Sequence, residues 1–327
     1  MMSLGIAVRR NRALYLSILI LILLIAAPAF VSGYWVRTFT DIFMFAVLAG
    51  SWNLIAGYCG YPAFGNVVFF GLGAYTTGIL MTKLQVSFFF AVAAGGILSI
   101  FLAILLGLPL LRLRGHYFAI ATLGVNEALR EVVINLTDLT GGGYGISLPI
   151  LPGKVEEVLA FFYFIMLGLM VALIILTEIF SKRRFGFACR AIRADEDAAS
   201  VVGIDTRKYK ILAWSASGFF TGLAGGVYAV WITYIDPVSV FDMSIAVKFC
   251  IMVLLGGAGT VLGPIIGAFT LEIISLVVWT KFLVLHAAIL GFIIILVVIF
   301  MPRGFMQFAK GKMTMAGILL NIKENRL

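Results

Sequence analysis

Runs of about twenty apolar residues recur along this chain from Ala13 almost to Met301. Each run is about long enough to cross a bilayer hydrocarbon core of ~30 Å as a helix. Charged residues make up only 12% of the 327 positions, whereas a soluble domain carries roughly 25%. The sequence therefore predicts an all-α, polytopic membrane protein.

Ten transmembrane helices are expected, at 13–31, 41–57, 63–81, 88–111, 117–136, 158–180, 210–231, 243–258, 261–280 and 284–301. The first follows the basic stretch MMSLGIAVRRNR, which resembles the start of a signal peptide, but we expect an uncleaved helix. The third and ninth are rich in glycine and can be broken or partly re-entrant. Such backbone must be buried within protein or line a cavity, so both segments belong inside the bundle.

The basic residues indicate the orientation. With the N-terminus inside, the inside segments hold 18 Lys and Arg residues and the outside segments hold 4. This asymmetry is the positive-inside pattern, and it explains the +9 net charge without a nucleic-acid partner. We expect a cytoplasmic N-terminus (1–12), a permease domain in the lipid bilayer (13–301) and a cytoplasmic tail (302–327). Two longer connections stand out, an external loop at 137–157 and a cytoplasmic loop at 181–210.

The cytoplasmic loop carries the most informative motif. Residues 188–202 are predicted to form one short helix with an apolar stripe of Ala188, Ile192, Ala199 and Val202. Gly203 would end this helix because glycine accepts a left-handed conformation. Asp197-Ala198-Ala199 and then Gly203 resemble the Glu-Ala-Ala-x-x-x-Gly signature of ABC importer permeases. In those proteins the helix docks in a groove of an ATPase subunit. Arg193, Asp197, Ala198, Ala199 and Gly203 are therefore the expected coupling residues.

The flanking sequence makes the resemblance more specific. FGFACRAIRADEDAASVVGIDTRKYKILAWSASGFFTGLAGGVYA (185–229), LTGGGYGI (139–146), GYCGYPAFGNVVFFGLGAYT (57–76) and LLGGAGTVLGPIIGA (254–268) are similar to the M-type permeases of branched-chain amino-acid ABC transporters. The departures are Asp197, where Glu is usual, and Tyr61, Ala63 and Asn66, where the family often has Gln, Ser and His.

The resemblance implies a complex in a bacterial or archaeal inner membrane. Its other members would be a second, related permease, two P-loop ATPases and an extracytoplasmic binding protein. The chain has no Gly-Lys-Ser/Thr phosphate loop of its own. Leucine, isoleucine and valine are the implied substrates, although relatives carry other amino acids, amides or urea. No cofactor, metal site or nucleophile–base constellation is expected, so the chain is predicted to be a transport subunit and not an enzyme.

Charges inside the apolar runs mark a second group of candidates. Glu127, Arg130 and Glu131 share one side of the fifth helix, and Glu272 lies in the ninth, where Lys248 could reach it. A charge at mid-membrane costs roughly 2.5–3.5 kcal/mol, so such groups face a partner or a wet cavity. They form an ion network between helices or line the path of a zwitterionic substrate. Tyr61, Asn66 and Tyr75 are further candidates for that path.

If the carboxylates were instead a proton or ion relay, the chain would be a stand-alone secondary transporter or channel. The 181–210 loop favours the importer, because a stand-alone transporter does not need it. Two glycine ladders are predicted to line helix faces that allow close packing: Gly218, Gly222 and Gly226, and Gly259, Gly263 and Gly267.

Overall fold

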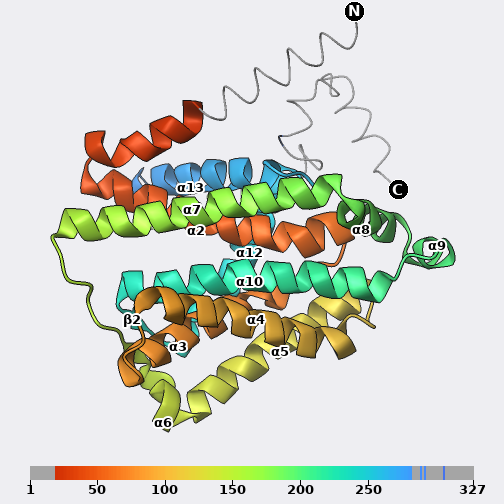
Figure 1. The fold of residues 1–327 in the computed structure, drawn as a ribbon, viewed down its shortest axis with the longest axis horizontal. Coiled ribbons are helices and arrows are strands. Elements are labelled where there is room, and N and C mark those ends of the chain that lie inside the picture. Colours follow the sequence, from red (N-terminus) through yellow and green to blue (C-terminus); the bar gives the residue numbers. More distant parts are fainter. Residues whose placement is uncertain (1–18, 282–287, 289–290, 292–304, 306–327) are drawn as a thin grey trace, which may run out of the picture.

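The computed structural model describes residues 19–281 together with 288, 291 and 305. Long helices lie side by side, running in parallel and antiparallel directions (Figure 1). A helix at Leu19–Phe30 comes first. The other elements are α2 (Gly33–Asn53), the π-helical turn η1 (Leu54–Tyr58), the 3₁₀ turn η2 (Phe64–Asn66), α3 (Val67–Lys83), α4 (Phe88–Leu110), α5 (Gly115–Asn135), α6 (Thr137–Thr140), the 3₁₀ turn η3 (Gly142–Tyr144), β1 (Ile146–Ser147), α7 (Val155–Lys182), α8 (Arg184–Ala194), α9 (Glu196–Val201), α10 (Thr206–Ile232), β2 (Tyr234–Ile235), α11 (Pro237–Val240), α12 (Met243–Gly256) and α13 (Gly263–Lys281).

Six helical segments in the described part are long and apolar enough to cross a membrane: Gly33–Tyr58, Phe64–Lys83, Phe88–Leu110, Val155–Lys182, Thr206–Ile232 and Pro237–Gly256. The helix at Leu19–Phe30 and the apolar part of α13 are shorter, and α5 carries three charged residues in its second half. The expected tenth helix, 284–301, lies almost wholly outside the described residues. The multi-pass, all-α architecture is therefore confirmed, and the count of ten stays a prediction.

Helix α10 lies at the centre of the bundle and packs closely on α3 and α4, because its interior face is made of small residues. A Cβ added to Gly222 would stand 2.9 Å from the Cβ of Ser99 and 3.1 Å from the carbonyl oxygen of Gly95. A Cβ on Gly218 would meet the ring of Phe69 at 3.3 Å. The first glycine ladder is thus a packing face, as its spacing predicts.

The second ladder does not share one helix face, and that prediction is wrong. Gly259 lies in the turn between α12 and α13, where its φ of +77° suits glycine. Gly263 is the first residue of α13, and Gly267 packs against the backbone of Met252 and Gly256 on α12. The four-residue spacing of these glycines therefore extends over a turn and the helix that follows it, and not over one continuous helix.

Two other expected boundaries also change. The predicted loop before residue 41 does not exist, because α2 begins at Gly33, directly after Ser32. Helix α10 begins at Thr206, four residues earlier than expected, because the carboxylate of Asp205 accepts a hydrogen bond from the backbone N–H of Lys208 and caps the helix.

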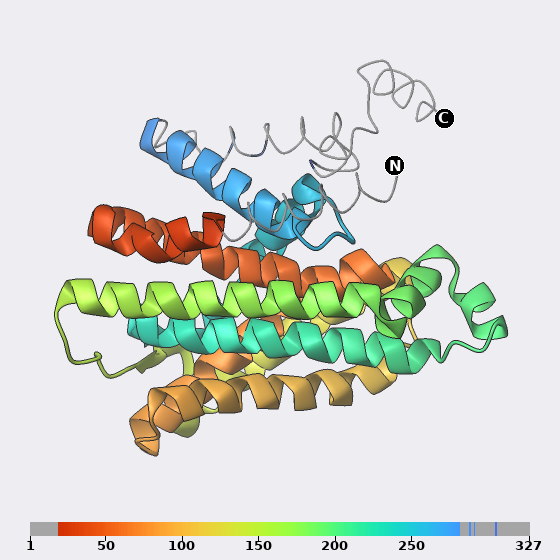
Figure 2. The same ribbon diagram turned by 45° about the horizontal axis from the view of Figure 1, so that its top comes forward.

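The two ends of the bundle differ. At one end α8 and α9 project beyond the long helices (Figure 2), and we call this the α9 end. At the other, β1 pairs with β2 in antiparallel register, Ile146 opposite Ile235 and Ser147 opposite Tyr234. This sheet end therefore joins the 137–157 loop to the segment after α10.

Candidate functional site

The predicted coupling helix is two helices, α8 and α9, and not one. Asp195 breaks the run with an extended backbone, φ −161° and ψ 115°. Its carboxylate accepts a hydrogen bond of 2.9 Å from the backbone N–H of Ala198, so the residue caps α9 in place of continuing α8. Gly203, with φ +87°, follows α9 and adopts the left-handed conformation that the sequence predicts.

The apolar stripe is confirmed in part. Ala188, Ile192 and Ala199 are 3–5% exposed and pack against the bundle. Val202, also expected on the stripe, is 75% exposed because the break at Asp195 rotates α9 relative to α8. Val201 is 86% exposed, so the end of α9 presents two neighbouring apolar side chains outward.

An ion pair anchors α9 to the bundle. The Lys210 ammonium lies 2.6 Å from the Glu196 carboxylate, and the two side chains are 4% and 14% exposed. Lys210 also donates to the backbone carbonyl of Leu111 at 2.9 Å and to the Tyr61 hydroxyl at 3.1 Å. Tyr61 in turn donates to the second oxygen of Glu196. One buried ammonium thus joins α9 and α10 to the turn after α4 and to the segment between η1 and η2.

The electrostatics of this cluster favour the charged form of Glu196. Burial alone would raise the pKa of its carboxyl, but the hydrogen bonds from Lys210 and Tyr61 outweigh burial, so the pKa lies below its ordinary value. Burial and the hydrogen bond to Glu196 raise the pKa of Tyr61, so its hydroxyl stays a donor at neutral pH.

A second link joins α9 to the start of α5. The Arg114 guanidinium forms a two-pronged pair with the Asp197 carboxylate, with distances of 2.8 and 2.7 Å, and its Nε lies 3.8 Å from Glu196. The hydrogen bond from Arg114 holds the pKa of Asp197 below its ordinary value. Asp197, the departure from Glu in the motif, is therefore a paired carboxylate.

Arg193 connects α8 to the same interruption in the helices. Its guanidinium donates to the backbone carbonyl of Gly57, inside the π-helical turn η1. Gly60, with φ +79°, leaves room for the Arg193 side chain, since a Cβ there would stand 2.9 Å from Cγ of Arg193. The cytoplasmic loop at 181–210 therefore contacts the break between α2 and α3 at two residues, Gly57 and Tyr61.

The other candidates from the first glycine-rich segment are packed inside this chain. Asn66 is fully buried, and its amide donates to Ser217 at 3.1 Å and Thr221 at 3.2 Å on α10. Tyr75 is 3% exposed, and its ring stacks on Phe241. Neither residue lines the cavities between α2, α12 and α13. Their contacts therefore give no support for a position on the substrate path.

The charged trio of α5 is paired within itself. Arg130 lies 2.8 Å from Glu127 and 3.7 Å from Glu131, and the three side chains are 30–59% exposed. The three side chains face away from this chain's own core. Apolar residues of the same helix, Ile120 and Val132, are exposed as well.

Glu272 on α13 pairs with Lys248 on α12 at 2.6 Å, as the sequence suggested. Both line a cavity together with Asp41 of α2. Sequence reasoning missed Asp41 because it placed that residue at a helix end. It also missed Arg114 and Lys210, which entered only the count of basic residues, and Glu196, which it did not single out. The sole signal for Lys210 was its place next to an apolar run.

The family model described as "Branched-chain amino acid transport system / permease component" matches residues 34–298. The high-affinity branched-chain amino acid transport system permease protein LivM of Escherichia coli is 28% identical over 317 residues, covering 89% of this chain and 74% of LivM. The autoinducer 2 import system permease protein LsrC of Photorhabdus luminescens is 30% identical over 200 residues, covering 56% and 57%. Among solved structures, PsaBC from Streptococcus pneumoniae in complex with Fab covers 84% of this chain and 94% of its own, at 15% identity and a TM-score of 0.42.

Proposed function

The chain belongs to the family of branched-chain amino acid transport system permease components, and on that premise we propose that α9 couples it to an ATPase which drives import. The chain is a membrane-spanning transport subunit of an ABC importer. Movement of the ATPase would reach the membrane helices through the contacts of α9.

The projecting α8–α9 pair carries this proposal. Val201 and Val202 stand exposed at the end of the molecule, beside the exposed Ala198, and an apolar knob of this kind suits a groove on a partner protein. The anchoring contacts are made by the carboxylates of Glu196 and Asp197, which are not part of this apolar knob. A partner can therefore hold α9 without competing with Lys210 and Arg114 for the same side chains.

Displacement of α9 would move three parts of the bundle together. Glu196 carries the motion to α10 through Lys210 and to the break between α2 and α3 through Tyr61. Asp197 carries it to the start of α5 through Arg114. We assign Tyr61 to this linkage and not to the substrate path, because its hydrogen bonds to described residues are with Glu196 and Lys210 of the coupling cluster.

The exposed trio of α5 supports a second permease subunit as partner. Half-exposed charges in the second half of α5 are costly to face lipid, so the surface around Glu127 and Glu131 would lie against another protein or a water-filled path between the two. The trio carries one net negative charge, which favours a basic group opposite it. We therefore propose that this is where the two permeases meet.

The remaining assembly follows from the family and the charge pattern. We propose two ATPases at the α9 end, a binding protein at the sheet end and a bacterial or archaeal inner membrane as location. Arg112, Arg114 and the basic residues of 182–210 gather at the α9 end, and by the positive-inside rule this supports a cytoplasmic location for that end. Branched-chain amino acids are the proposed cargo, since the family description and the LivM relative name them.

The test is co-purification of the tagged chain from its host in mild detergent, with wild type compared to Val202→Asp. We expect P-loop ATPases and a second permease to accompany the wild-type chain, and the ATPases to be lost from Val202→Asp because the charge cannot enter an apolar groove. The matched control is Val238→Asp, since Val238 is 64% exposed on α11, next to the sheet end. ATPases retained by Val202→Asp, or lost equally from Val238→Asp, would contradict docking through α9.

A further inference from the structure

A two-part cavity lies between α2, α12 and α13. One part, of about 360 Å³, is lined by Thr38, Asp41, Ile42, Phe45, Lys248, Glu272, Ser275 and Leu276. The adjoining part, of about 540 Å³, shares Phe45, Lys248 and Ser275 with the first. Both volumes fall within the ~300–1,000 Å³ usual for small-molecule sites. The cavity has one wall of polar groups and one of apolar groups.

The polar part holds charges of both signs. Lys248 lies 2.6 Å from Glu272, and its ammonium stands 3.9 Å from the centroid of the Phe45 ring. An ammonium has three N–H donors, so this pair leaves Lys248 able to bind another anion. Asp41 forms no ion pair within the described part of the chain. Its charged neighbours are Glu272, Lys248 and Arg37, and Arg37 reaches across the ring of Trp231 at 5.8 Å.

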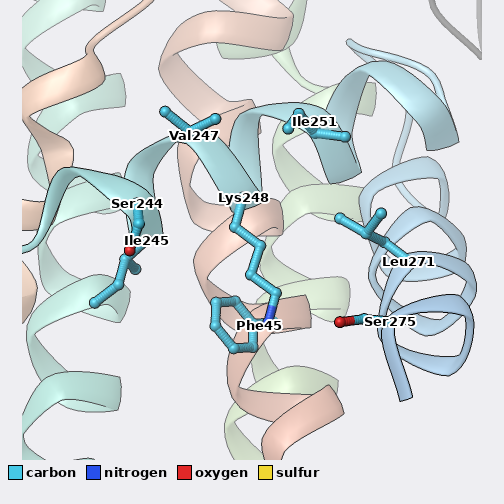
Figure 3. A pocket seen from close by; sticks show the side chains of 8 residues that line it. All are labelled: Phe45, Ser244, Ile245, Val247, Lys248, Ile251, Leu271 and Ser275. Carbon is cyan, nitrogen blue, oxygen red and sulfur yellow. The ribbon is translucent and has the colours of Figure 1, made fainter. Parts of the chain in front are cut away.

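The apolar part begins at Lys248 itself. Figure 3 shows Lys248 extending from α12 toward Phe45, with Ser275 and Leu271 facing it from α13 and Ile245 and Ile251 on the same helix as the lysine. Among the described residues that line this part, Lys248 is the only one with a charge, and most of the others are aliphatic. A ligand that reaches from Asp41 past Lys248 would place its far end among them.

The cavity lies nearer the sheet end than the α9 end. Asp41 follows the start of α2 by eight residues, a rise of about 12 Å. Gly57, which contacts the coupling loop, comes sixteen residues later, about 24 Å further on. The site thus lies toward the end where we place the binding protein, and away from the ATPases.

We propose that this cavity binds an aliphatic α-amino acid as a zwitterion. The ligand's ammonium pairs with Asp41, its carboxylate pairs with Lys248, and its side chain occupies the space between Phe45, Ile251 and Leu271. A lone anion would meet two carboxylates, and a lone cation would meet Lys248, so a small ligand carrying both charges fits best. This inference rests on the proposed function, because it locates a binding site for the proposed cargo within this chain.

The test measures ligand binding in the intact complex without the binding protein, because that protein would otherwise set the apparent affinity. A cysteine is introduced by Ser275→Cys in a Cys250→Ser background, and its labelling by a small water-soluble maleimide is timed in nanodiscs. Leucine at about ten times its dissociation constant leaves roughly a tenth of the sites free, so labelling should slow about tenfold. Adding Asp41→Asn should abolish this protection, and Glu178→Gln, a carboxylate on α7 paired with Lys182 outside the cavity, should leave it intact.

A size test separates binding from folding. Ile251→Trp fills the apolar part, so it should remove protection by leucine while alanine, which has a shorter side chain, still protects. An unreactive Ser275→Cys, leucine protection that survives Asp41→Asn, or slowing by phosphatidylethanolamine in the nanodisc and not by leucine would each overturn the site. ATP-driven leucine import without protection would overturn this site alone. Protection without ATP-driven import would leave the site standing and overturn the proposed coupling.

Discussion

Replacing Lys210 by methionine removes the ammonium that holds α9 while keeping most of the side chain's bulk. Removing one partner of a buried ion pair costs ~3–5 kcal/mol. Glu196 is still 14% exposed and has Arg114 at 3.8 Å, so partial compensation places the expected loss near the lower end. About 3 kcal/mol corresponds to roughly a hundredfold change in the equilibrium between anchored and released α9.

Hydrogen exchange reports this equilibrium directly. The amide of Ala199 donates to Asp195 and that of Val202 donates to Ala198, and both bonds depend on α9 keeping its shape. We expect exchange at these amides in Lys210→Met to accelerate about a hundredfold, or up to the rate of an unprotected chain. The matched control is Lys208→Met, because Lys208 is exposed on the same helix. Unchanged exchange in Lys210→Met would refute the claim that this ammonium anchors α9.

Three further predictions follow from other contacts. Gly222→Ala should lower the free energy of unfolding by ~1–3 kcal/mol through overpacking. Gly124→Ala, where a Cβ meets no described atom within 4 Å, should leave it unchanged or raise it by up to ~1 kcal/mol; detergent melting curves compare the two variants. Because the pKa of Glu196 is lowered, its contribution to the stability of α9 is fully present above the ordinary pKa of 4.5 and is lost as pH falls through the lower folded value. Hydrogen exchange of α9, corrected for the intrinsic rate, should therefore be constant from neutral pH to about pH 5 and rise only in acid. Arg193→Ala removes a charged hydrogen bond worth ~1.5–3 kcal/mol and should reduce import per ATP hydrolysed, while Arg190→Ala should leave that ratio unchanged; coupled uptake and phosphate-release assays measure it.

The membrane-spanning character was predictable because it depends on local composition, as was the packing of α10. Every apolar run from 41 to 280 that the sequence predicts is a helix in the structure, and Gly218 and Gly222 pack as their spacing indicates. The break at Asp195 was not predicted, because a single capping carboxylate outweighed an amphipathic pattern that continued across it.

Long-range partners were beyond the sequence. Tyr61 and Lys210 are separated by 149 residues, and nothing local marks either as a member of one cluster. Asp41 was missed for a related reason. A carboxylate at a presumed helix end looks solvated until residues of α12 and α13 are known to line the same cavity. The Glu127–Arg130–Glu131 pairing was predictable from helical spacing, but its outward direction was not.

The most direct test of the account is leucine uptake into proteoliposomes that contain the complete complex, with binding protein and ATP supplied on opposite sides. We expect uptake that requires ATP, and an Ala198→Arg variant that keeps its membrane insertion but loses both ATPase binding and uptake. Uptake by the chain alone, driven by an ion gradient and indifferent to Ala198→Arg, would contradict it and make the intramembrane carboxylates the centre of the mechanism.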